Sequence, residues 1–226
     1  MTNREFDRKI AVVTGACGAV GAEVVAELAE RGALVTAVDR DGRGLCDLVE
    51  RLQRAGLRVA GRQVDIASGP AVESLVDQVE REVGPLDIAV NAADLLRTGS
   101  ATGLTDDDWA QSFAINTHAV FHLSRAAASR MAPRRGGAIV TIATTLPAHQ
   151  PGFAAYAASK AAATAYATGL AAEVARHGVH CTVIAPTRPE TPLLRSVAEH
   201  DAHAASVVAA VLAALAHQID GTAVGA

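Results

Sequence analysis

Cysteine is scarce in this sequence and follows no metal-binding pattern. The 226 residues contain three cysteines, Cys17, Cys46 and Cys181, and none belongs to a CxxC pair or to a Cys/His ligand spacing. Disulfide frameworks and zinc sites require such patterns. The eight histidines form no HExxH pair either. We therefore expect no metal, and free thiols in a reducing, cytoplasmic compartment.

The sequence also lacks a large excess of charge of one sign and a long apolar run. Twenty Lys and Arg stand against 24 Asp and Glu, a net charge of -4. The basic cluster of Arg130, Arg134 and Arg135 is too short to follow a phosphate backbone, so no nucleic-acid partner is expected. No stretch of about 18 residues lacks polar interruption, which argues against a membrane span. The sequence predicts a soluble protein.

Hydrophobic residues, by contrast, make up half of the chain, and charged residues only 19%. Short β-branched runs alternate with longer segments of helical period, the pattern of βαβ units in a parallel sheet. No linker interrupts it, so we predict a single domain over residues 1–226. The fold class expected is α/β, a doubly wound parallel sheet (Rossmann fold) of about seven strands with helices on both faces. The predicted strands are Lys9–Thr14, Leu34–Val38, Arg58–Val64, Asp87–Asn91, Ala138–Ile142, Val179–Ile184 and Thr222–Val224.

One long helix and a final helix stand out among the helical segments. Thr105 followed by Asp108 is typical of an N-cap, and we expect the helix that it starts to run through Met131. The last 35 residues are strongly Ala-rich and predict a final helix before the seventh strand.

A glycine-rich turn, TGACGAVG over residues 14–21, follows the first predicted strand and precedes a helix. Glycines there let backbone N–H groups approach a pyrophosphate at the helix N-terminus. The second strand ends at Asp39, whose carboxylate can accept hydrogen bonds from an adenosine ribose and repels a 2′-phosphate. Arg40 could meet that phosphate but cannot remove the carboxylate. The pattern predicts a dinucleotide site that prefers NAD to NADP.

Tyr156 and Lys160 stand four residues apart, on one face of a predicted helix. A free tyrosine titrates at about 10, too high for efficient proton transfer near neutral pH. A neighbouring ammonium lowers the proton affinity of the phenol. Beside a nucleotide site, the pair predicts the proton-transfer half of a hydride transfer, with Tyr156 as acid/base and Lys160 as its activator.

With these motifs in this order, the whole chain resembles the short-chain dehydrogenases/reductases. The resemblance also includes Asp65-Ile66 after the third strand, Asn91-Ala92-Ala93 after the fourth, and Asn116. It implies that Asp65 and Ile66 flank the adenine, that Lys160 also binds the nicotinamide ribose, and that Asn116 holds a proton-relaying water. The implied cofactor residues are Gly15, Gly18, Ala19, Val20, Gly21, Asp39, Arg40, Asp65, Ile66, Asn91, Ala92, Ala93, Tyr156, Lys160, Pro186 and Thr191.

A narrower resemblance is to 2,3-dihydro-2,3-dihydroxybenzoate dehydrogenases and related dihydro-hydroxyanthranilate dehydrogenases. It is carried by LLRTGSATGLTDDDWAQSFAINT (residues 95–117), RRGGAIVTIAT (134–144), His149 to Pro151, and Glu190 to Ser196. The implied reaction is NAD-dependent oxidation of a cyclic hydroxy-acid intermediate of siderophore or natural-product biosynthesis.

The catalytic hydroxyl departs from the family's pattern. Ala143 stands thirteen residues before Tyr156, where the family has a Ser that hydrogen-bonds the reacting oxygen. Either Thr144 or Thr145 beside it could supply an equivalent hydroxyl. We assign the role to Thr144.

Three further departures lie along the cofactor cleft. Ala19 replaces the middle glycine of the turn, Thr187 replaces the glycine after Pro186, and Asp94 adds a carboxylate after Asn91-Ala92-Ala93. They keep open a second hypothesis, a catalytically degraded Rossmann domain that serves as a binding or assembly partner.

The segment after Thr191 is short for this family. Only about ten residues, Pro192 to Asp201, precede the final helix, where the family places two short helices over the substrate. We expect a shortened lid and an open cleft unless another subunit, a partner protein or a large substrate covers it. The resemblance also suggests a homodimer or homotetramer built on the helices that begin near Thr105 and Tyr156.

Overall fold

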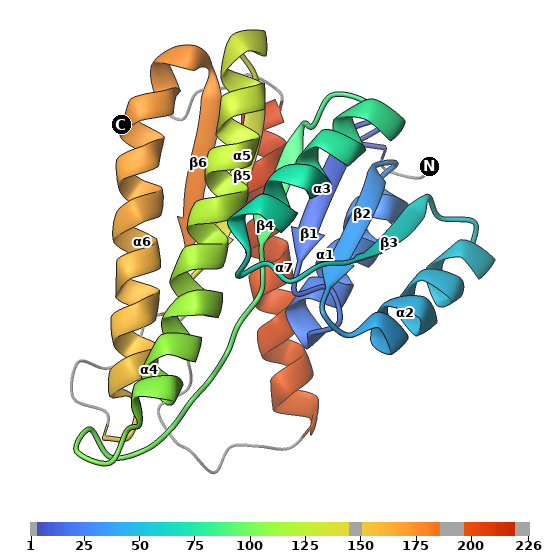
Figure 1. Ribbon diagram of the computed structural model, residues 1–226. Coiled ribbons are helices and arrows are strands. Elements are labelled where there is room, and N and C mark those ends of the chain that lie inside the picture. The colour runs from blue at the N-terminus through green and yellow to red at the C-terminus, as the bar shows by residue number, and fades with distance from the viewer. Residues whose placement is uncertain (1–3, 145–150, 186–196, 220–226) are drawn as a thin grey trace.

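The computed structural model describes residues 4–144, 151–185 and 197–219. Six strands form one parallel sheet in the order β3-β2-β1-β4-β5-β6 (Figure 1). The strands are β1 (Ile10–Thr14), β2 (Leu34–Asp39), β3 (Val59–Gln63), β4 (Ile88–Asn91), β5 (Gly137–Ile142) and β6 (Val179–Ile184). The predicted fold class is confirmed, with six strands rather than seven. The seventh predicted strand, Thr222–Val224, lies outside the described residues.

Helices cover both faces of the sheet. α1 (Ala19–Glu30), α2 (Gly42–Arg54) and α7 (Val197–Ile219) pack on one face. α3 (Gly69–Glu82), α5 (Ala119–Arg134) and α6 (Ala154–Val174) pack on the other, in front of the sheet in Figure 1. A strand covered on both sides has no solvated face, which is why every residue of β1, IAVVT, is buried.

The long helix predicted from Thr105 begins as expected but is not continuous. The Thr105 hydroxyl caps α4 (Asp106–Phe113) by accepting the Asp108 N–H at 3.1 Å. A π-helical turn, η1 (Ala114–His118), then separates α4 from α5. Such single turns insert an extra residue into a helix and re-aim its side chains. Here the turn contains the fully buried Asn116.

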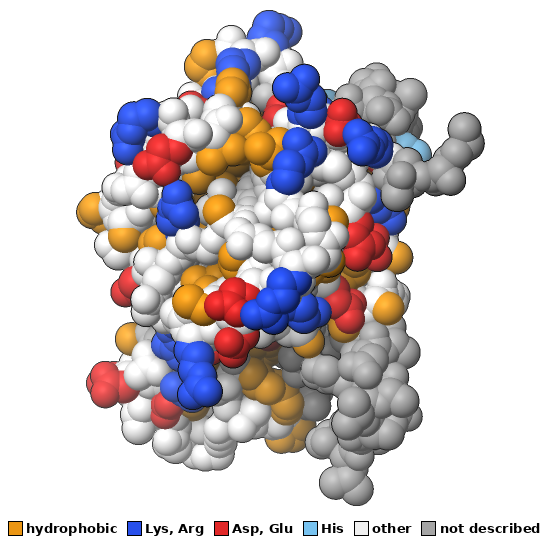
Figure 2. All heavy atoms as spheres, turned by 90° about the vertical axis from the view of Figure 1, so that its right-hand side faces the viewer, with side chains coloured by type: hydrophobic (Ala, Val, Ile, Leu, Met, Phe, Trp, Pro, Cys, Tyr) orange, Lys and Arg blue, Asp and Glu red, His pale blue; other side chains and the backbone are white. Residues whose placement is uncertain are grey.

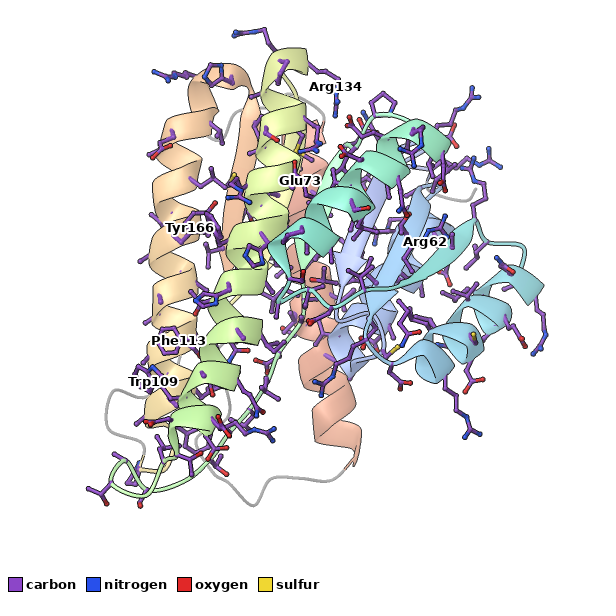
Figure 3. The ribbon with its side chains drawn as sticks, in the orientation of Figure 1. Arg62, Glu73, Trp109, Phe113, Arg134 and Tyr166 are labelled. Carbon is purple, nitrogen blue, oxygen red and sulfur yellow. The ribbon has the colours of Figure 1, made fainter. Side chains whose placement is uncertain are left out.

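Arginines near the end of α5 form ion pairs with α3. Arg130, with 18% of its side chain exposed, lies 2.7 Å from Glu73 and 2.5 Å from Asp77, and Arg134 lies 2.7 Å from Glu80. Glu73 and Arg134 are labelled in Figure 3. Two of the three arginines of the basic cluster noted in the sequence are therefore neutralised by α3.

The charges on the visible face are mixed in sign. Figure 2 shows Lys and Arg side chains interspersed with Asp and Glu, without a broad patch of either sign. No helix in the described ranges is long and apolar enough to span a bilayer.

The strand order reverses between β1 and β4, which pair in parallel with Thr14 opposite Asn91. After β1 the chain continues into α1 on one face of the sheet. After β4 it continues to the helices on the opposite face. In open parallel sheets such a reversal creates a crevice beyond the carboxyl ends of the strands. The sheet topology therefore places the candidate site at this edge.

Candidate active site

A cavity of about 320 Å³ opens where β1 and β4 end, within the size range of small-molecule sites. It brings together residues from the glycine turn, from the ends of β2, β3, β4 and β5, and from α6 and α7. Those predicted from the sequence are Gly15, Gly18, Ala19, Val20, Gly21, Asp39, Arg40, Asp65, Ile66, Ala92, Ala93, Thr144, Tyr156 and Lys160.

The glycine turn is closed by backbone contacts that leave no room for a side chain at Gly15 or at Gly21. Gly15 has φ +66°, and a Cβ there would lie 2.5 Å from the Ala93 Cα. A Cβ on Gly21 would lie 2.1 Å from the Gly15 carbonyl oxygen. α1 begins directly after Gly18, which provides no side-chain cap. The amides of its first turn are thus suited to bind an anion.

Asp39 lines the cavity at the end of β2 and is held there by two backbone amides. Its Oδ2 accepts the Cys17 N–H at 3.0 Å and its Oδ1 accepts the Asp41 N–H at 3.1 Å. Burial, together with the nearby carboxylates of Asp39 and Asp41, raises the pKa of the Cys17 thiol to about 11. The thiol is therefore neutral near pH 7 and adds no negative charge beside Asp39.

Tyr156 and Lys160 lie in the first two turns of α6 and are almost fully buried. The Lys160 ammonium lies 5.9 Å from the centre of the Tyr156 ring and donates to the Ile142 carbonyl at 3.3 Å. It also lies 3.0 Å from Asp94 Oδ1. The Tyr156 hydroxyl donates to the other Asp94 oxygen, Oδ2, at 3.1 Å. Asp94 therefore bridges the two predicted catalytic side chains.

Thr144 follows β5 and lines the same cavity. Its hydroxyl is buried and has no hydrogen-bond partner within the described ranges. A buried hydroxyl without a partner carries a desolvation cost that a bound ligand can remove. Thr144 can therefore supply the hydroxyl that Ala143 lacks. Thr145, Pro186 and Thr191 lie outside the described residues, as does the predicted lid up to residue 196. Residues 197–201, which were predicted to precede the final helix, instead belong to α7.

Two of the sequence-predicted residues lie behind the cavity rather than on its wall. Asn91 donates from Nδ2 to Ser124 Oγ at 2.9 Å and to Thr141 Oγ1 at 3.3 Å. Asn116 donates from Nδ2 to the Leu95 carbonyl at 2.9 Å and to Ser159 Oγ at 3.0 Å, and its Oδ1 accepts the Leu95 N–H. Asn91 thus connects the end of β4 to α5 and β5, and Asn116 connects the segment after β4 to α6. A water held by Asn116 stays a prediction.

Sequence reasoning assigned no site role to several residues that line the cavity, among them Asp94, Ala204 and Val207. Asp94 was noted only as an added charge, although its position one residue after Ala93 places it at the carboxyl edge. Ala204 and Val207 line the cavity from α7. No motif marks them, because their role depends on how the last helix packs against α1 and the sheet.

Comparisons with known proteins agree with this geometry. Residues 9–202 match the family model described as short chain dehydrogenase. A 2,3-dihydro-2,3-dihydroxybenzoate dehydrogenase of Bacillus subtilis is 34% identical over 194 residues, 85% of this chain and 74% of the relative. The resemblances stated from the motifs are confirmed at that level.

Solved structures show the same fold with either cofactor. A Burkholderia phymatum short chain dehydrogenase/reductase in complex with NAD is 26% identical, with TM-score 0.82, covering 95% of this chain and 88% of the other. A Burkholderia cenocepacia gluconate 5-dehydrogenase in complex with NADP and tartrate is 27% identical, with TM-score 0.81, covering 96% and 92%. Similarity to these structures alone therefore does not show whether this chain binds NAD or NADP.

The glycine turn yields a first prediction. We expect Gly21→Ala to lower the free energy of unfolding by about 2 kcal/mol or more, since its methyl group meets a backbone carbonyl that cannot yield. The matched variant Gly18→Ala, whose Cβ would lie 3.3 Å from the same carbonyl, should cost less than about 1 kcal/mol. Urea unfolding measures both. Equal stabilities would show that the turn is not closed as described.

Proposed function

The chain belongs to the short chain dehydrogenase family, and from this premise we propose that it is an NAD-dependent oxidoreductase that transfers a hydride between nicotinamide and an alcohol or ketone carbon. The observation that carries the proposal is the position of Tyr156 and Lys160 in one cavity with the glycine turn and Asp39. One part of that cavity fits a dinucleotide, and the other provides an acid/base.

The described residues fit the cofactor at three points. The first turn of α1 would bind the pyrophosphate, and the fixed Asp39 carboxylate would accept hydrogen bonds from the adenosine ribose. Lys160 has three N–H donors, and within the described ranges it uses two, on Ile142 and Asp94, so the third would be available to the nicotinamide ribose. When bound, NAD supplies the carbon that accepts the hydride.

The chain's own residues then handle the proton. In alcohol oxidation, Tyr156 takes the proton of the substrate hydroxyl while the hydride leaves the adjacent carbon. The unpaired Thr144 hydroxyl would donate to the same substrate oxygen and fix its position. Apolar side chains of Ile115 and Val207 line the cavity around these groups and limit water.

For the substrate we propose a cyclic hydroxy-acid such as a dihydro-dihydroxybenzoate, an intermediate of siderophore or natural-product biosynthesis. Support comes from the Bacillus subtilis relative, a 2,3-dihydro-2,3-dihydroxybenzoate dehydrogenase. Oxidation of such a ring gives a ketone that tautomerises to an aromatic phenol, which draws the reaction toward oxidation.

A catalytically degraded binding domain is the second candidate. It is favoured by Ala143 and by the Asp94 carboxylate, which engages both Tyr156 and Lys160. Titration with NADH separates the two hypotheses. Binding at micromolar concentration supports the enzyme, because dehydrogenase cofactors are used in the range of about 1 μM to 1 mM. Absence of binding at millimolar NADH supports the second candidate.

Replacing Tyr156 by Phe tests the acid/base role. We expect Tyr156→Phe to lower turnover of 2,3-dihydro-2,3-dihydroxybenzoate by about 10² to 10⁴, because the variant cannot transfer the proton. NADH affinity should change little. The matched control is Tyr166→Phe, because Tyr166 lies on the α5 side of α6, in edge contact with Phe121 at 5.3 Å (Figure 3). A Tyr156→Phe protein with wild-type turnover would contradict the assignment.

Cofactor preference depends on Asp39. We expect kcat/KM with NAD to exceed that with NADP by at least about tenfold, equivalent to about 1.4 kcal/mol, because the carboxylate repels the 2′-phosphate. Asp39→Asn should reduce this ratio. The exposed Asp47→Asn, which removes a charge from the neighbouring helix α2, should leave it unchanged. Equal efficiency of wild-type protein with both cofactors would show that Arg40 outweighs Asp39.

We also propose that the protein is a homo-oligomer that uses the outer faces of α5 and α6. Ala161 and Ala165 lie exposed on α6, and small side chains permit close helix approach. We expect an assembled species in light scattering at micromolar concentration. Ala165→Arg should convert it to monomers by steric and charge repulsion, whereas Ala55→Arg at the end of α2 should not. A monomeric wild-type mass would refute this interface.

A further inference from the structure

Asp94 has a position that neither the motifs nor the proposed reaction explains. It follows β4 by three residues, and its two carboxylate oxygens contact different partners: Oδ2 the Tyr156 hydroxyl at 3.1 Å, Oδ1 the Lys160 ammonium at 3.0 Å. Both partners are almost fully buried, whereas 36% of the Asp94 side chain is exposed. The carboxylate thus connects a buried acid/base to solvent.

The Asn116 side chain makes its hydrogen bonds with Leu95 and Ser159 rather than with the phenol. Both of its N–H donors are used, on the Leu95 carbonyl and on Ser159 Oγ, and its oxygen accepts the Leu95 N–H. It does not line the cavity. Asp94 lines the cavity and contacts the phenol directly.

We propose that Asp94 is a further catalytic residue: it accepts the proton of Tyr156 and exchanges it with solvent. The inference rests on the proposed function, since it needs Tyr156 to act as acid/base. The proposal adds Asp94 to Tyr156 and Lys160 as a third proton-transfer group. Of the three, Asp94 is the one whose side chain is exposed to solvent.

The proton and electron balance is simple. In alcohol oxidation the substrate O–H proton moves to the Tyr156 oxygen while the phenol proton moves to Asp94 Oδ2, and the hydride leaves carbon for the oxidised cofactor. A C=O bond forms from the broken O–H and C–H bonds. The Asp94 carboxylic acid then releases H⁺ to water. The sum is alcohol plus NAD⁺ giving ketone, NADH and H⁺, and reduction reverses each step.

Titration of the phenol in the cofactor-free protein tests the contact without any substrate. The chain has two tyrosines, Tyr156 and Tyr166, so in a Tyr166→Phe background the near-ultraviolet phenolate absorbance reports Tyr156 alone. Of the described charged groups that contact the phenol or its ring, Lys160 on α6 favours phenolate and Asp94 after β4 opposes it. We expect Asp94→Asn to lower the pH of half-ionisation by about one unit.

The matched control for that titration is Asp107→Asn, which removes an exposed charge from α4. It should leave the phenol titration unchanged. An Asp94→Asn protein that titrates like its parent would overturn the proposal, because the carboxylate would then not be coupled to the phenol.

Chemical rescue tests the proton transfer itself. With NAD and 2,3-dihydro-2,3-dihydroxybenzoate, we expect Asp94→Ala to lower turnover by about 10² or more while NADH binding persists. Formate is a small carboxylate able to occupy the vacated space, and it should raise the turnover of Asp94→Ala at least tenfold. Chloride at equal ionic strength should not raise it. Full activity of Asp94→Ala, or a loss that formate leaves unchanged, would overturn the proposal.

The two proposals fail in different ways. If the wild-type protein neither binds NADH nor oxidises the probe, the proposed function fails, and the titration still decides whether Asp94 is coupled to Tyr156. If the wild-type protein is active, Tyr156→Phe is inactive and Asp94→Ala is unaffected, the function holds and the role of Asp94 is rejected.

Discussion

The close approach of the chain after β1 to the chain after β4 is the constraint on which the site depends. Gly15 meets Ala93 so closely that even a methyl group has no space. This contact joins the two halves of the sheet at the carboxyl ends of β1 and β4. From there the chain continues to helices on opposite faces of the sheet. Because of it, the N-terminus of α1 and the segment with Asp94 border one cavity. The glycine turn and the pair of Tyr156 and Lys160, which come from distant parts of the sequence, thus line one cavity.

Within that site, the buried ammonium of Lys160 determines the electrostatics. A lysine almost without solvent contact needs hydrogen-bond acceptors or a counter-charge, because burying an unpaired charge is costly. The Ile142 carbonyl provides an acceptor and Asp94 provides the charge. The same carboxylate accepts the Tyr156 hydroxyl, so the group that stabilises Lys160 also favours the protonated phenol. The Asp94 side chain therefore links the stability of the buried Lys160 charge to the protonation of Tyr156.

Much of the architecture could be predicted because it follows from local rules. Apolar runs, the glycine turn and the four-residue spacing of Tyr156 and Lys160 identify the strands, the nucleotide turn and one helical face without knowledge of tertiary contacts. Six of the predicted strands match observed ones within a residue or so at each end. The π-turn at Ala114–His118 was missed, because its hydrogen-bond shift leaves no periodic signal in the sequence.

The parts that were not predicted depend on distances between elements. The sequence places Asp94 near the cleft but cannot show that its two oxygens divide between Tyr156 and Lys160. Likewise, Arg130 and Arg134 read as a basic cluster until α3 is seen to supply Glu73, Asp77 and Glu80 as partners. In both cases charges of opposite sign meet across helices or loops that are far apart in the chain, a geometry set by the sheet.

The final helix shows how such distant packing affects the chemistry. α7 lies against α1 and the sheet, with Val211 and Leu215 fully buried, and this anchoring brings Ala204 and Val207 to the cavity wall. Both side chains are small and apolar, so they narrow the cavity without offering a hydrogen bond to a substrate. Hydrogen-bonding groups of the cavity include the side chains of Thr144, Tyr156 and Asp94. The wall of the cavity is therefore apolar where α7 packs against it and polar where the segments after β4 and β5 and the start of α6 supply these three residues.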